Sequence, residues 1–389
     1  MQNFVYANPT KIFFGKDQVN NLGKEIKNFA SKILLVYGGK SIKENGVYDK
    51  VISQLNNYKI EFHELPGVVA NPRISLVEKG VEICRLHDAD LVLGVGGGSV
   101  IDTAKTIAAS VKFNGKPWEL FTKSMPINEA LPIAAVLTTA ATGSESNNCA
   151  VITNWERQEK RMISSEVLYP KFSILDPQIT YTMLPSQTVF GGIDIIVHIL
   201  EQYFHNDSFT PIQDGFCETL LKTVINNLPI VLKNGRNYNA RANIMWASTL
   251  ALNGILSTGV LSDWATHAIG QEISAIYDIP HGESLAMVWP SWAMYVYTNN
   301  CKRFKQYAVN VWDLSESNKN DSDIALEGIK ITKNFFDQLK AEAQINPLQL
   351  KVKDEDIELM AKKATENGPI GNFKKLYKED VMTILRRSF

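Results

Sequence analysis

The feature that most constrains the fold is a strand-like run that leads through a glycine-rich turn into a helix. Residues 90–95 (DLVLGV) form a short apolar run of the kind found in parallel sheets. The turn at residues 96–99 (GGGS) follows, and residues 100–109 have a helical pattern. Strand, turn and helix in this order predict an α/β sheet with parallel strands.

A second unit of the same kind lies nearer the N-terminus, with a strand at residues 32–37, a turn at 38–41 and a helix at 42–55. Strand-like runs alternate with helical patterns up to about residue 185, and the pattern beyond is almost wholly helical. A chain of 389 residues is long for a single core. We therefore predict an α/β dinucleotide-binding domain with a mainly parallel sheet at residues 1–185, followed by an all-helical metal-binding and substrate domain at residues 186–389.

The turn at residues 96–99 has the composition of an anion site. Glycines let the backbone approach a ligand closely, and the first N–H groups of the following helix attract negative charge. The turn is not the dinucleotide fingerprint, because Gly94, Gly96 and Ser99 depart from G-x-G-x-x-G at its last position. The alternative is an ordinary tight turn. The position of residues 96–99 between a strand and a helix favours phosphate binding over that alternative.

The turn at residues 38–41 bears on the choice between NAD and NADP. In a nucleotide-binding sheet, an acidic residue at the end of such a strand would bind the ribose 2′-hydroxyl of NAD. Here the turn offers no carboxylate but two glycines, a lysine and a serine, namely Gly38, Gly39, Lys40 and Ser41. Space and positive charge favour a 2′-phosphate, and hence NADP. The alternative is a surface turn with a solvated lysine.

The helical half contains a candidate metal site. Asp194 and His198 are spaced i, i+4 in an apolar helical run, so both side chains point to the same side. A buried carboxylate is costly unless a cation or a donor neutralises it. Two of the remaining histidines, His267 and His281, lie in settings that suit metal ligation, and one oxygen with three nitrogens suits zinc or iron(II). The alternative is an Asp–His ion pair, with His267 and His281 in core or turn positions.

These motifs together resemble those of a known family. They are Gly96-Gly97-Gly98-Ser99 with Asp102, residues 138–145 (TTAATGSE), Asp194-x-x-x-His198, His267, and Pro280-His281-Gly282. Their order and separations are similar to those of the iron-containing alcohol dehydrogenases, and within them to the NADP-linked butanol dehydrogenase branch. The resemblance covers essentially the whole chain, from residues 8–15 (NPTKIFFG) to the final helix.

The resemblance implies a role for each matching residue. The metal ligands would be Asp194, His198, His267 and His281. The pyrophosphate would lie against Gly96, Gly97, Gly98 and Ser99, with Asp102 nearby. A second cofactor loop would contain Thr138, Thr139 and Thr142, and a lysine in the turn at residues 159–161, Lys160, would approach the ribose. The adenosine end of NADP would meet Gly38, Gly39, Ser41 and Asn71, beside the Lys40 noted above.

One position departs from the family pattern. Family members commonly have a second histidine four residues after the one that matches His267, and it is credited with relaying a proton. Here that position is Gln271, which hydrogen-bonds but does not titrate near neutral pH. We therefore assign no protein general base beyond the metal ligands.

The resemblance implies an NADP(H)-dependent alcohol dehydrogenase or aldehyde reductase that acts on short-chain aliphatic substrates in a cleft between the two domains. Trp246, Trp264 and Trp289 are candidate wall residues, although each could equally pack in a core. The main alternative is a polyol (glycerol-type) dehydrogenase that uses NAD. A lyase of the dehydroquinate synthase kind would need basic residues around the metal, which the local sequence lacks. A non-catalytic nucleotide-binding protein would leave the four predicted ligands without a role.

Composition mainly excludes other functions. The net charge of −1 gives no electrostatic case for nucleic acid or an anionic membrane. The first residues lack the charged and apolar regions of a signal peptide, no apolar stretch is long enough to span a bilayer, and the four cysteines are scattered. We expect a cytoplasmic enzyme with reduced thiols, and the resemblance implies a homodimer. Iron versus zinc, substrate length and reaction direction stay open.

Overall fold

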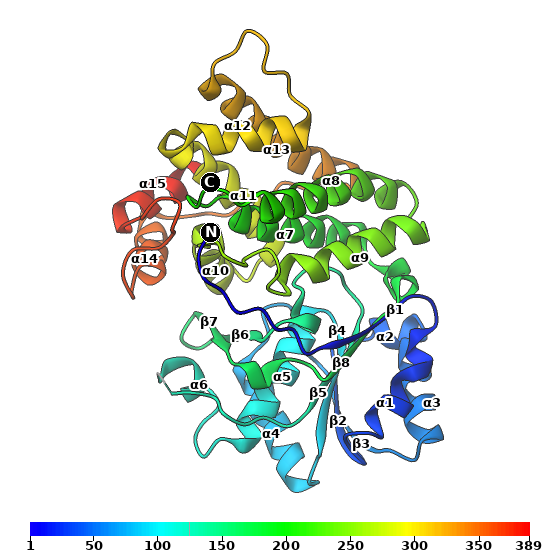
Figure 1. The fold of residues 1–389 in the computed structure, drawn as a ribbon. Coiled ribbons are helices and arrows are strands. Elements are labelled where there is room, and N and C mark those ends of the chain that lie inside the picture. The colour runs from blue at the N-terminus through cyan, green and yellow to red at the C-terminus, as the bar shows by residue number, and fades with distance from the viewer. Residues whose placement is uncertain (124) are drawn as a thin grey trace. The chain divides into compact units, whose positions relative to one another are not determined.

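The computed structural model describes residues 1–123 and 125–389 (Figure 1). Six strands form one sheet in the order β1-β8-β5-β4-β2-β3, and every neighbouring pair is parallel, which confirms the predicted mainly parallel sheet. The strands are β1 (Lys11–Phe14), β2 (Lys32–Tyr37), β3 (Glu61–Leu65), β4 (Leu91–Gly96), β5 (Ile133–Leu137) and β8 (Phe172–Leu175).

The register of the central strands gathers the predicted turns at one edge of the sheet. Tyr37 pairs with Val95, and Gly96 pairs with Leu137, so β2, β4 and β5 end side by side. The turns that follow these three strands therefore share the carboxyl edge, where open α/β sheets bind ligands.

Helices cover both faces of this sheet, and β4 is therefore buried along its whole length. On one face pack α1 (Leu22–Ile26) and α3 (Val47–Asn57), and on the other pack α4 (Ile74–Leu86) and α5 (Gly98–Lys112). The helix predicted at residues 42–55 is in fact two, α2 (Ser41–Glu44) and α3, because Gly46 adopts a left-handed conformation with φ 76°.

A separate antiparallel hairpin joins β6 (Cys149–Asn154) to β7 (Glu159–Ser164). The sequence analysis placed Lys160 in a turn, and this was wrong. Lys160 lies in β7 and pairs with Thr153, because the turn is completed earlier, at Gln158, whose φ of 51° is left-handed. Short elements complete this region, namely α6 (Glu119–Thr122), η1 (Gln18–Asn21), η2 (Ser144–Ser146), η3 (Glu166–Leu168) and η4 (Pro177–Thr182).

The described residues after 184 are helical, as predicted, and contain no strand longer than an isolated bridge. The helices are α7 (Pro185–Tyr203), α8 (Pro211–Lys233), α9 (Tyr238–Leu252), α10 (Ala265–Tyr277), α11 (His281–Val296), η5 (Tyr297–Asn299), α12 (Cys301–Trp312), α13 (Asp321–Glu342), α14 (Asp354–Ala364) and α15 (Lys378–Ser388). Among the described residues, no helix combines the length and the apolar character needed to cross a bilayer.

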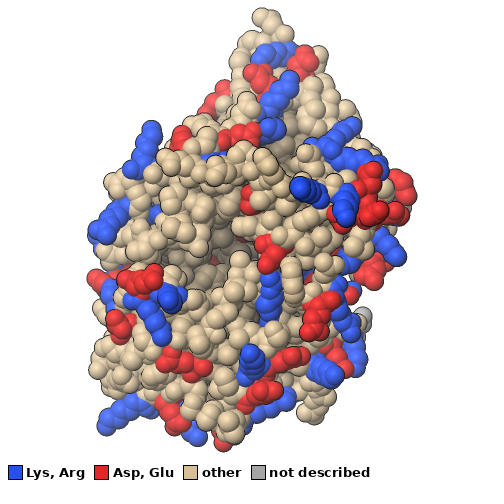
Figure 2. Space-filling model, turned by 180° about the vertical axis from the view of Figure 1, so that it is seen from behind, with Lys and Arg blue, Asp and Glu red and all other residues tan. Residues whose placement is uncertain are grey.

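The chain folds into two compact units. The α/β unit comprises Ala7–Met183 and Gly235–Asn253, so α9 belongs with the sheet. The helical unit comprises Met1–Tyr6, Leu184–Asn234 and Gly254–Phe389. The domain boundary at residue 185 stays a prediction. Basic and acidic side chains are interspersed over the face seen in Figure 2, in keeping with the nearly neutral net charge.

Candidate metal centre and cofactor turns

Two of the predicted metal ligands lie on α7, in the helical unit. Asp194 and His198 are 3% and 5% exposed, and Asp194 Oδ1 lies 3.5 Å from His198 Nδ1. Their i, i+4 spacing places both side chains on one face of the helix, as predicted.

The other two predicted ligands come from the next helices and meet the same carboxylate. Nε2 of His267, on α10, lies 3.9 Å from Asp194 Oδ1, and Nε2 of His281, the first residue of α11, lies 4.0 Å from it. Candidate ligand atoms of Asp194, His267 and His281 all lie within 4.8 Å of one another. His198 is not in that group of three, although its ring stacks on that of His267 at 4.4 Å.

The donor set fits a divalent ion. Asp194 Oδ1, His198 Nδ1 and His267 Nε2 are buried, and none has a hydrogen-bond partner among the described residues. Buried polar atoms are normally satisfied, so an open group of an acid and imidazoles points to a cation. Ligand atoms around a tetrahedral zinc would lie about 3.4 Å apart. The observed separations from Asp194 Oδ1 of 3.5, 3.9 and 4.0 Å are close to that value.

The pKa values indicate which groups of the cluster carry charge when no metal ion is bound. Burial alone would raise the pKa of Asp194, but the three histidines outweigh burial and lower it. Burial lowers the pKa of His198 to about 4, whereas the carboxylates of Asp194 and Glu201 outweigh burial at His267 and raise its pKa to about 9. A protonated His267 therefore compensates the buried carboxylate, and a metal ion bound there would displace that proton.

The sequence around His281 brings α11 close to α7. A Cβ at Gly282 would lie 2.0 Å from the carbonyl oxygen of Phe190, so only glycine permits this approach. Pro280 is the N-cap residue of α11, so the helix begins at His281. The Pro-His-Gly run thus delivers His281 at the very start of a helix held against the one that carries Asp194.

The other residues that were expected near the metal lie in different parts of the structure. The Trp264 ring lies 5.3 Å from that of His267, beside the cluster. Trp289 is 1% exposed and packs in the core of the helical unit, whereas Trp246 belongs to the α/β unit and contacts Phe14. Gln271, on α10, is half-buried one turn beyond His267.

One residue of this centre was missed by the sequence analysis. Glu201 on α7 is 1% exposed, and its Oε1 lies 2.9 Å from Nδ1 of His267. The signal was present, since Asp194, His198 and Glu201 are spaced i, i+4, i+7 and share one face of α7. Three ionisable side chains on one face of a largely apolar helix indicate that they belong to one site.

In the α/β unit, the glycine turn and the threonine segment contact one another at the carboxyl edge of the sheet. A Cβ at Gly98 would lie 2.2 Å from Oγ1 of Thr142, and a Cβ at Gly97 would lie 3.1 Å from Cβ of Thr139. Neither glycine has a positive φ, so glycine is required here by close packing. The helix α5 begins at Gly98 with no side-chain cap, and the N–H of Thr138 donates to the Gly96 carbonyl, so the threonine segment adjoins the turn that leads into the helix.

Asp102 lies near the start of α5 and fixes the position of the neighbouring segments through hydrogen bonds. Its carboxylate accepts hydrogen bonds from Ser144 Oγ at 2.5 Å and from the Val151 N–H at 2.9 Å. Burial raises the pKa of Asp102, and the nearby Lys105 ammonium opposes that shift. Asp102 thereby links α5 to η2 and β6.

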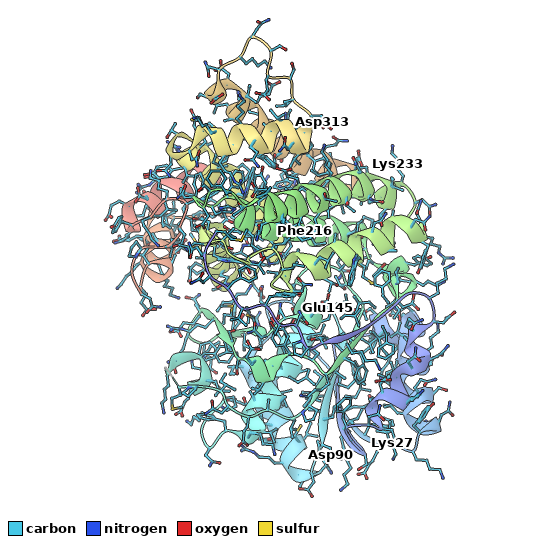
Figure 3. The ribbon with its side chains drawn as sticks, viewed as in Figure 1. Lys27, Asp90, Glu145, Phe216, Lys233 and Asp313 are labelled. Carbon is cyan, nitrogen blue, oxygen red and sulfur yellow. The ribbon has the colours of Figure 1, made fainter. Side chains whose placement is uncertain are left out.

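Lys105, one turn further along α5, was missed by the sequence analysis. It is 0% exposed, and its ammonium donates to the carbonyls of Asn147 and Cys149 and to Asn147 Oδ1, each at 2.8 Å. Glu145 (Figure 3) is also 0% exposed and accepts from Thr249 Oγ1 of α9 at 2.6 Å. A helical pattern does not single out a buried lysine, so the sequence offered no signal for it.

The residues predicted near the adenosine occupy two places. Lys160 Nζ donates to Oδ1 of Asn71 at 3.0 Å, and both side chains are buried, so the structure joins two predicted residues that are distant in sequence. Gly39, Lys40 and Ser41 are exposed at the start of α2.

The tip of β2 also has a carboxylate nearby that the sequence analysis did not foresee. Glu64 of the adjacent strand β3 accepts from the hydroxyls of Tyr37 at 2.5 Å and Tyr48 at 2.8 Å. Lys43 lies over the rings of both tyrosines. Both oxygens of Glu64 are therefore already engaged within the protein.

Comparison with known proteins agrees with this geometry. Residues 9–177 match the family model described as iron-containing alcohol dehydrogenase, and residues 188–389 match that of the C-terminal part of the Fe-containing alcohol dehydrogenase family. The chain is 48% identical to the probable NADH-dependent butanol dehydrogenase 1 of Bacillus subtilis, over 100% of both chains. It is 38% identical to the NADPH-dependent aldehyde reductase YqhD of Escherichia coli, over 95% of this chain and 94% of that protein.

A solved structure is similar over the whole fold. The crystal structure of NADH-dependent butanol dehydrogenase A from Thermotoga maritima has a TM-score of 0.93 and 38% identity, covering 100% of this chain and 99% of that one. The parallel sheet with its glycine turn, the helical half with its acid and histidines, and matches along both halves lead to one conclusion. The chain belongs to the iron-containing alcohol dehydrogenase family, in its butanol dehydrogenase branch.

Proposed function

We propose that this alcohol dehydrogenase transfers a hydride between NADP(H) and a short-chain aliphatic aldehyde or primary alcohol. Family membership implies a nicotinamide cofactor and a divalent metal. The observation that carries the proposal is the buried cluster on α7, α10 and α11, whose Asp194 and His267 present open ligand atoms.

We assign Asp194, His198, His267 and His281 as the ligands of Fe²⁺ or Zn²⁺. A divalent ion bound there would supply Lewis acidity to the substrate oxygen. The chain itself contributes the rest: α7 and α11 hold the ligands in place, and Trp264 provides an apolar wall beside His267. Gln271 cannot take a proton near neutral pH, so we assign no protein group to the proton transfer.

For the cofactor, we assign the pyrophosphate to the first turn of α5, with Gly96, Gly97, Gly98 and Ser99. The free N–H groups of a helix start favour an anion there. Thr138, Thr139 and Thr142 would contact the cofactor from the neighbouring turn, and Asp102 would hold the two turns together. Lys160, fixed by Asn71, would approach the ribose.

The preference for NADP(H) over NAD(H) rests on the tip of β2. Gly38, Gly39, Lys40 and Ser41 leave room and positive charge for a 2′-phosphate, and Glu64, a carboxylate near the tip of β2, already binds Tyr37 and Tyr48. The relatives named as NADH-dependent make this the part of the proposal most in need of measurement.

We further propose that the enzyme works in the cytoplasm as a homodimer. All four cysteines are free thiols, which suits a reducing compartment. Among the described strands, β1 lies at the edge of the sheet and pairs with β8 alone, and an edge strand offers unpaired backbone groups to a second copy. Light scattering on a sizing column would test the dimer.

Initial rates with NADPH and NADH on a ladder of aldehydes from acetaldehyde upward, with metal content assayed on the same sample, test the function. We expect bound iron or zinc, turnover that stops after chelation, and a higher kcat/KM with NADPH. The variant Lys40→Ala should weaken NADPH more than NADH, with Lys16→Ala as a matched exposed-lysine control. Equal use of both cofactors would contradict the NADP proposal, and a clear preference for glycerol would favour the polyol alternative.

A further inference from the structure

Glu201 stands apart from the predicted ligands because it contacts one of them from the far side. It follows His198 by three residues on the same face of α7 and is 1% exposed. Its Oε1 meets three donors at the start of α10: the hydroxyl of Thr266, the N–H of His267 at 2.8 Å, and Nδ1 of His267 at 2.9 Å.

One of these contacts, from the N–H of His267, satisfies a backbone group at the beginning of α10. The first N–H groups of a helix lack partners within the helix. The N-cap residue of α10, Trp264, has a left-handed φ of 64° and gives no side-chain cap. Glu201 therefore caps α10 from a different helix, and its negative charge lies at the positive end of the α10 dipole.

The third contact determines which nitrogen of His267 is free. A carboxylate oxygen can only accept, so the 2.9 Å contact requires the proton to be on Nδ1 of His267. Nε2 is then left with its lone pair in the neutral ring, and it faces Asp194 Oδ1 at 3.9 Å. This is the orientation in which an imidazole binds a metal, and a carboxylate on the opposite nitrogen also makes the ring a stronger ligand.

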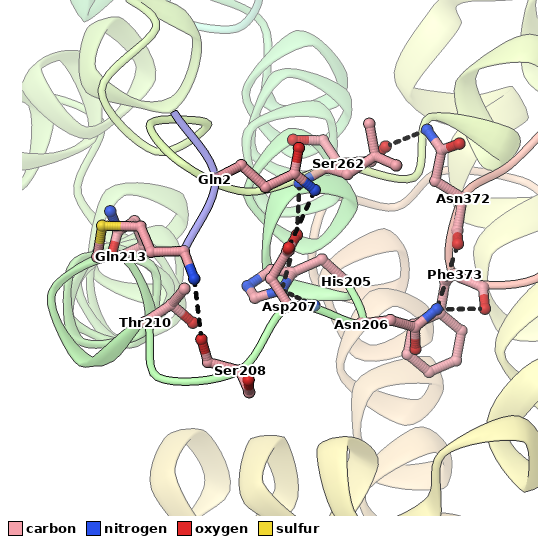
Figure 4. A network of polar contacts seen from close by, with 12 residues as sticks. Gln2, His205, Asn206, Asp207, Ser208, Thr210, Gln213, Ser262, Asn372 and Phe373 are labelled. Carbon is pink, nitrogen blue, oxygen red and sulfur yellow. Dashed lines mark hydrogen bonds and ion pairs between the residues drawn. The ribbon is translucent and has the colours of Figure 1, made fainter. Parts of the chain in front are cut away.

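The surroundings hold Glu201 and α10 in place. The N–H of Asp263 donates to the Glu201 carbonyl at 2.8 Å, and Asp263 Oδ2 accepts from the N–H of Ala265. Asp263 Oδ1 accepts from the N–H groups of Asn372 and Phe373, and Asn206 donates to the carbonyls of the same two residues (Figure 4). The start of α10 is thus tied to α7 and to the C-terminal segment.

We propose that Glu201 is a positioning residue of the metal centre: it fixes His267 as the Nδ1–H tautomer, with Nε2 aimed at the ion. This inference rests on the proposed function, because it presupposes that His267 binds a divalent metal. The competing explanation is that Glu201 serves only to cap α10. That explanation predicts an effect on stability and none on metal affinity.

The test measures the affinity of the chelated, full-length enzyme for Zn²⁺ by competition with a chromogenic chelator. Glu201→Met should weaken binding by about 10- to 100-fold, the usual cost of losing the outer partner of a metal-bound histidine. Glu201→Gln keeps an oxygen that accepts the same bonds and should lose less. Thr266→Val removes one donor to Glu201 without touching His267. It should lower the melting temperature of the metal-free protein and leave Zn²⁺ affinity within about twofold.

The outcomes separate the two proposals. If wild-type protein fails to bind Zn²⁺ tightly, the metal centre itself is wrong. If it binds tightly and Glu201→Met binds equally well with a lowered melting temperature, Glu201 is only a helix cap. Should Glu201→Met fail to fold, ¹⁵N spectra of the zinc-loaded wild-type protein, with His267→Asn for assignment, decide the matter. A proton on Nε2 of His267 overturns the inference, and a proton on Nδ1 supports it.

Discussion

Two buried polar clusters, one in each unit, differ in whether their polar atoms have hydrogen-bond partners. In the α/β unit, Lys105 is buried and its three donated bonds go to backbone and side-chain oxygens of Asn147 and Cys149. In the helical unit, Asp194 and His267 are equally buried, yet the atoms that they turn toward each other, Oδ1 and Nε2, have no hydrogen-bond partner among the described residues.

This difference indicates a structural role for one cluster and a ligand-binding role for the other. A buried charge whose bonds are all made within the protein holds a scaffold in one shape. A buried group of acid and imidazoles with open atoms is stable only with something bound, and an ion completes it. Substitutions around Lys105 should therefore change the free energy of unfolding whether or not metal is present. Substitutions in the helical cluster should change the effect of metal on stability and activity.

The largest expected effect is at Asp194. Asp194→Ala removes the carboxylate whose Oδ1 faces His198, His267 and His281. We expect loss of metal and a fall in kcat/KM of about 10³-fold, or about 4 kcal/mol. Zn²⁺ should raise the melting temperature of the wild type and leave that of the variant unchanged. His87→Gln, on an unrelated histidine of the α/β unit, is the control, and a metal-induced shift that survives in Asp194→Ala would contradict the assignment.

The next effect is at Lys105. Lys105→Met keeps the length of the side chain but leaves the oxygens of Asn147 and Cys149 without their donor. We expect the free energy of unfolding to fall by about 3 kcal/mol, measured by urea denaturation. Lys112→Met, in the last turn of the same helix, should change it by less than about 0.5 kcal/mol. Equal losses in the two variants would mean that the buried ammonium has no special role.

A smaller effect is expected where the two cofactor turns touch. Gly98→Ala would place a methyl group against Thr142, costing about 2 kcal/mol through overpacking, and should weaken NADPH binding. The double variant with Thr142→Ala should recover part of the loss, because the new methyl then meets a smaller side chain. Additive effects in a double-mutant cycle of unfolding energies would refute the direct contact.

The smallest effect concerns Asp90 (Figure 3), which accepts from the Ser31 and Lys32 N–H groups and from Ser31 Oγ. The backbone bond from Ser31 contributes most to the lowering of its pKa below 3.8. A lowered pKa stabilises the fold above the unfolded value, and this stabilisation is lost as pH falls through the folded value. Asp90→Asn should cost about 0.5 kcal/mol at pH 7, discounted for exposure, and progressively less below about pH 4. A difference that does not depend on pH would exclude the charge as its cause.

Local patterns explain most of what could be predicted about the fold. Strand β2 begins and ends at the predicted residues, and the ends of β4 are each within one residue of the prediction. The misplacement of Lys160 and the single helix predicted for α2 and α3 have one cause. Left-handed residues, Gln158 and Gly46, decide where a turn closes, and their conformation is not encoded in hydrophobic periodicity.

For the candidate site, the residue types and the spacing of Asp194 and His198 were enough to suggest metal ligation, with His267 and His281 as further candidates. The resemblance then assigned all four as one ligand set. The spacing on α7 could have marked Glu201, but the partners that these residues meet in the fold were not predictable. Glu201 meets His267, 66 residues later, and Gly98 is small because Thr142 lies against it.

By itself, then, the sequence determined the alternation of strands and helices, the helical second half, and the chemical character of the acid and histidines, because each depends on neighbours within a few turns of chain. Only the tertiary structure decided which buried group has a partner: Lys105 is satisfied, while Asp194 and His267 retain open atoms. The physical reason is that desolvation and hydrogen bonding depend on segments brought together by folding, and these are far apart along the chain.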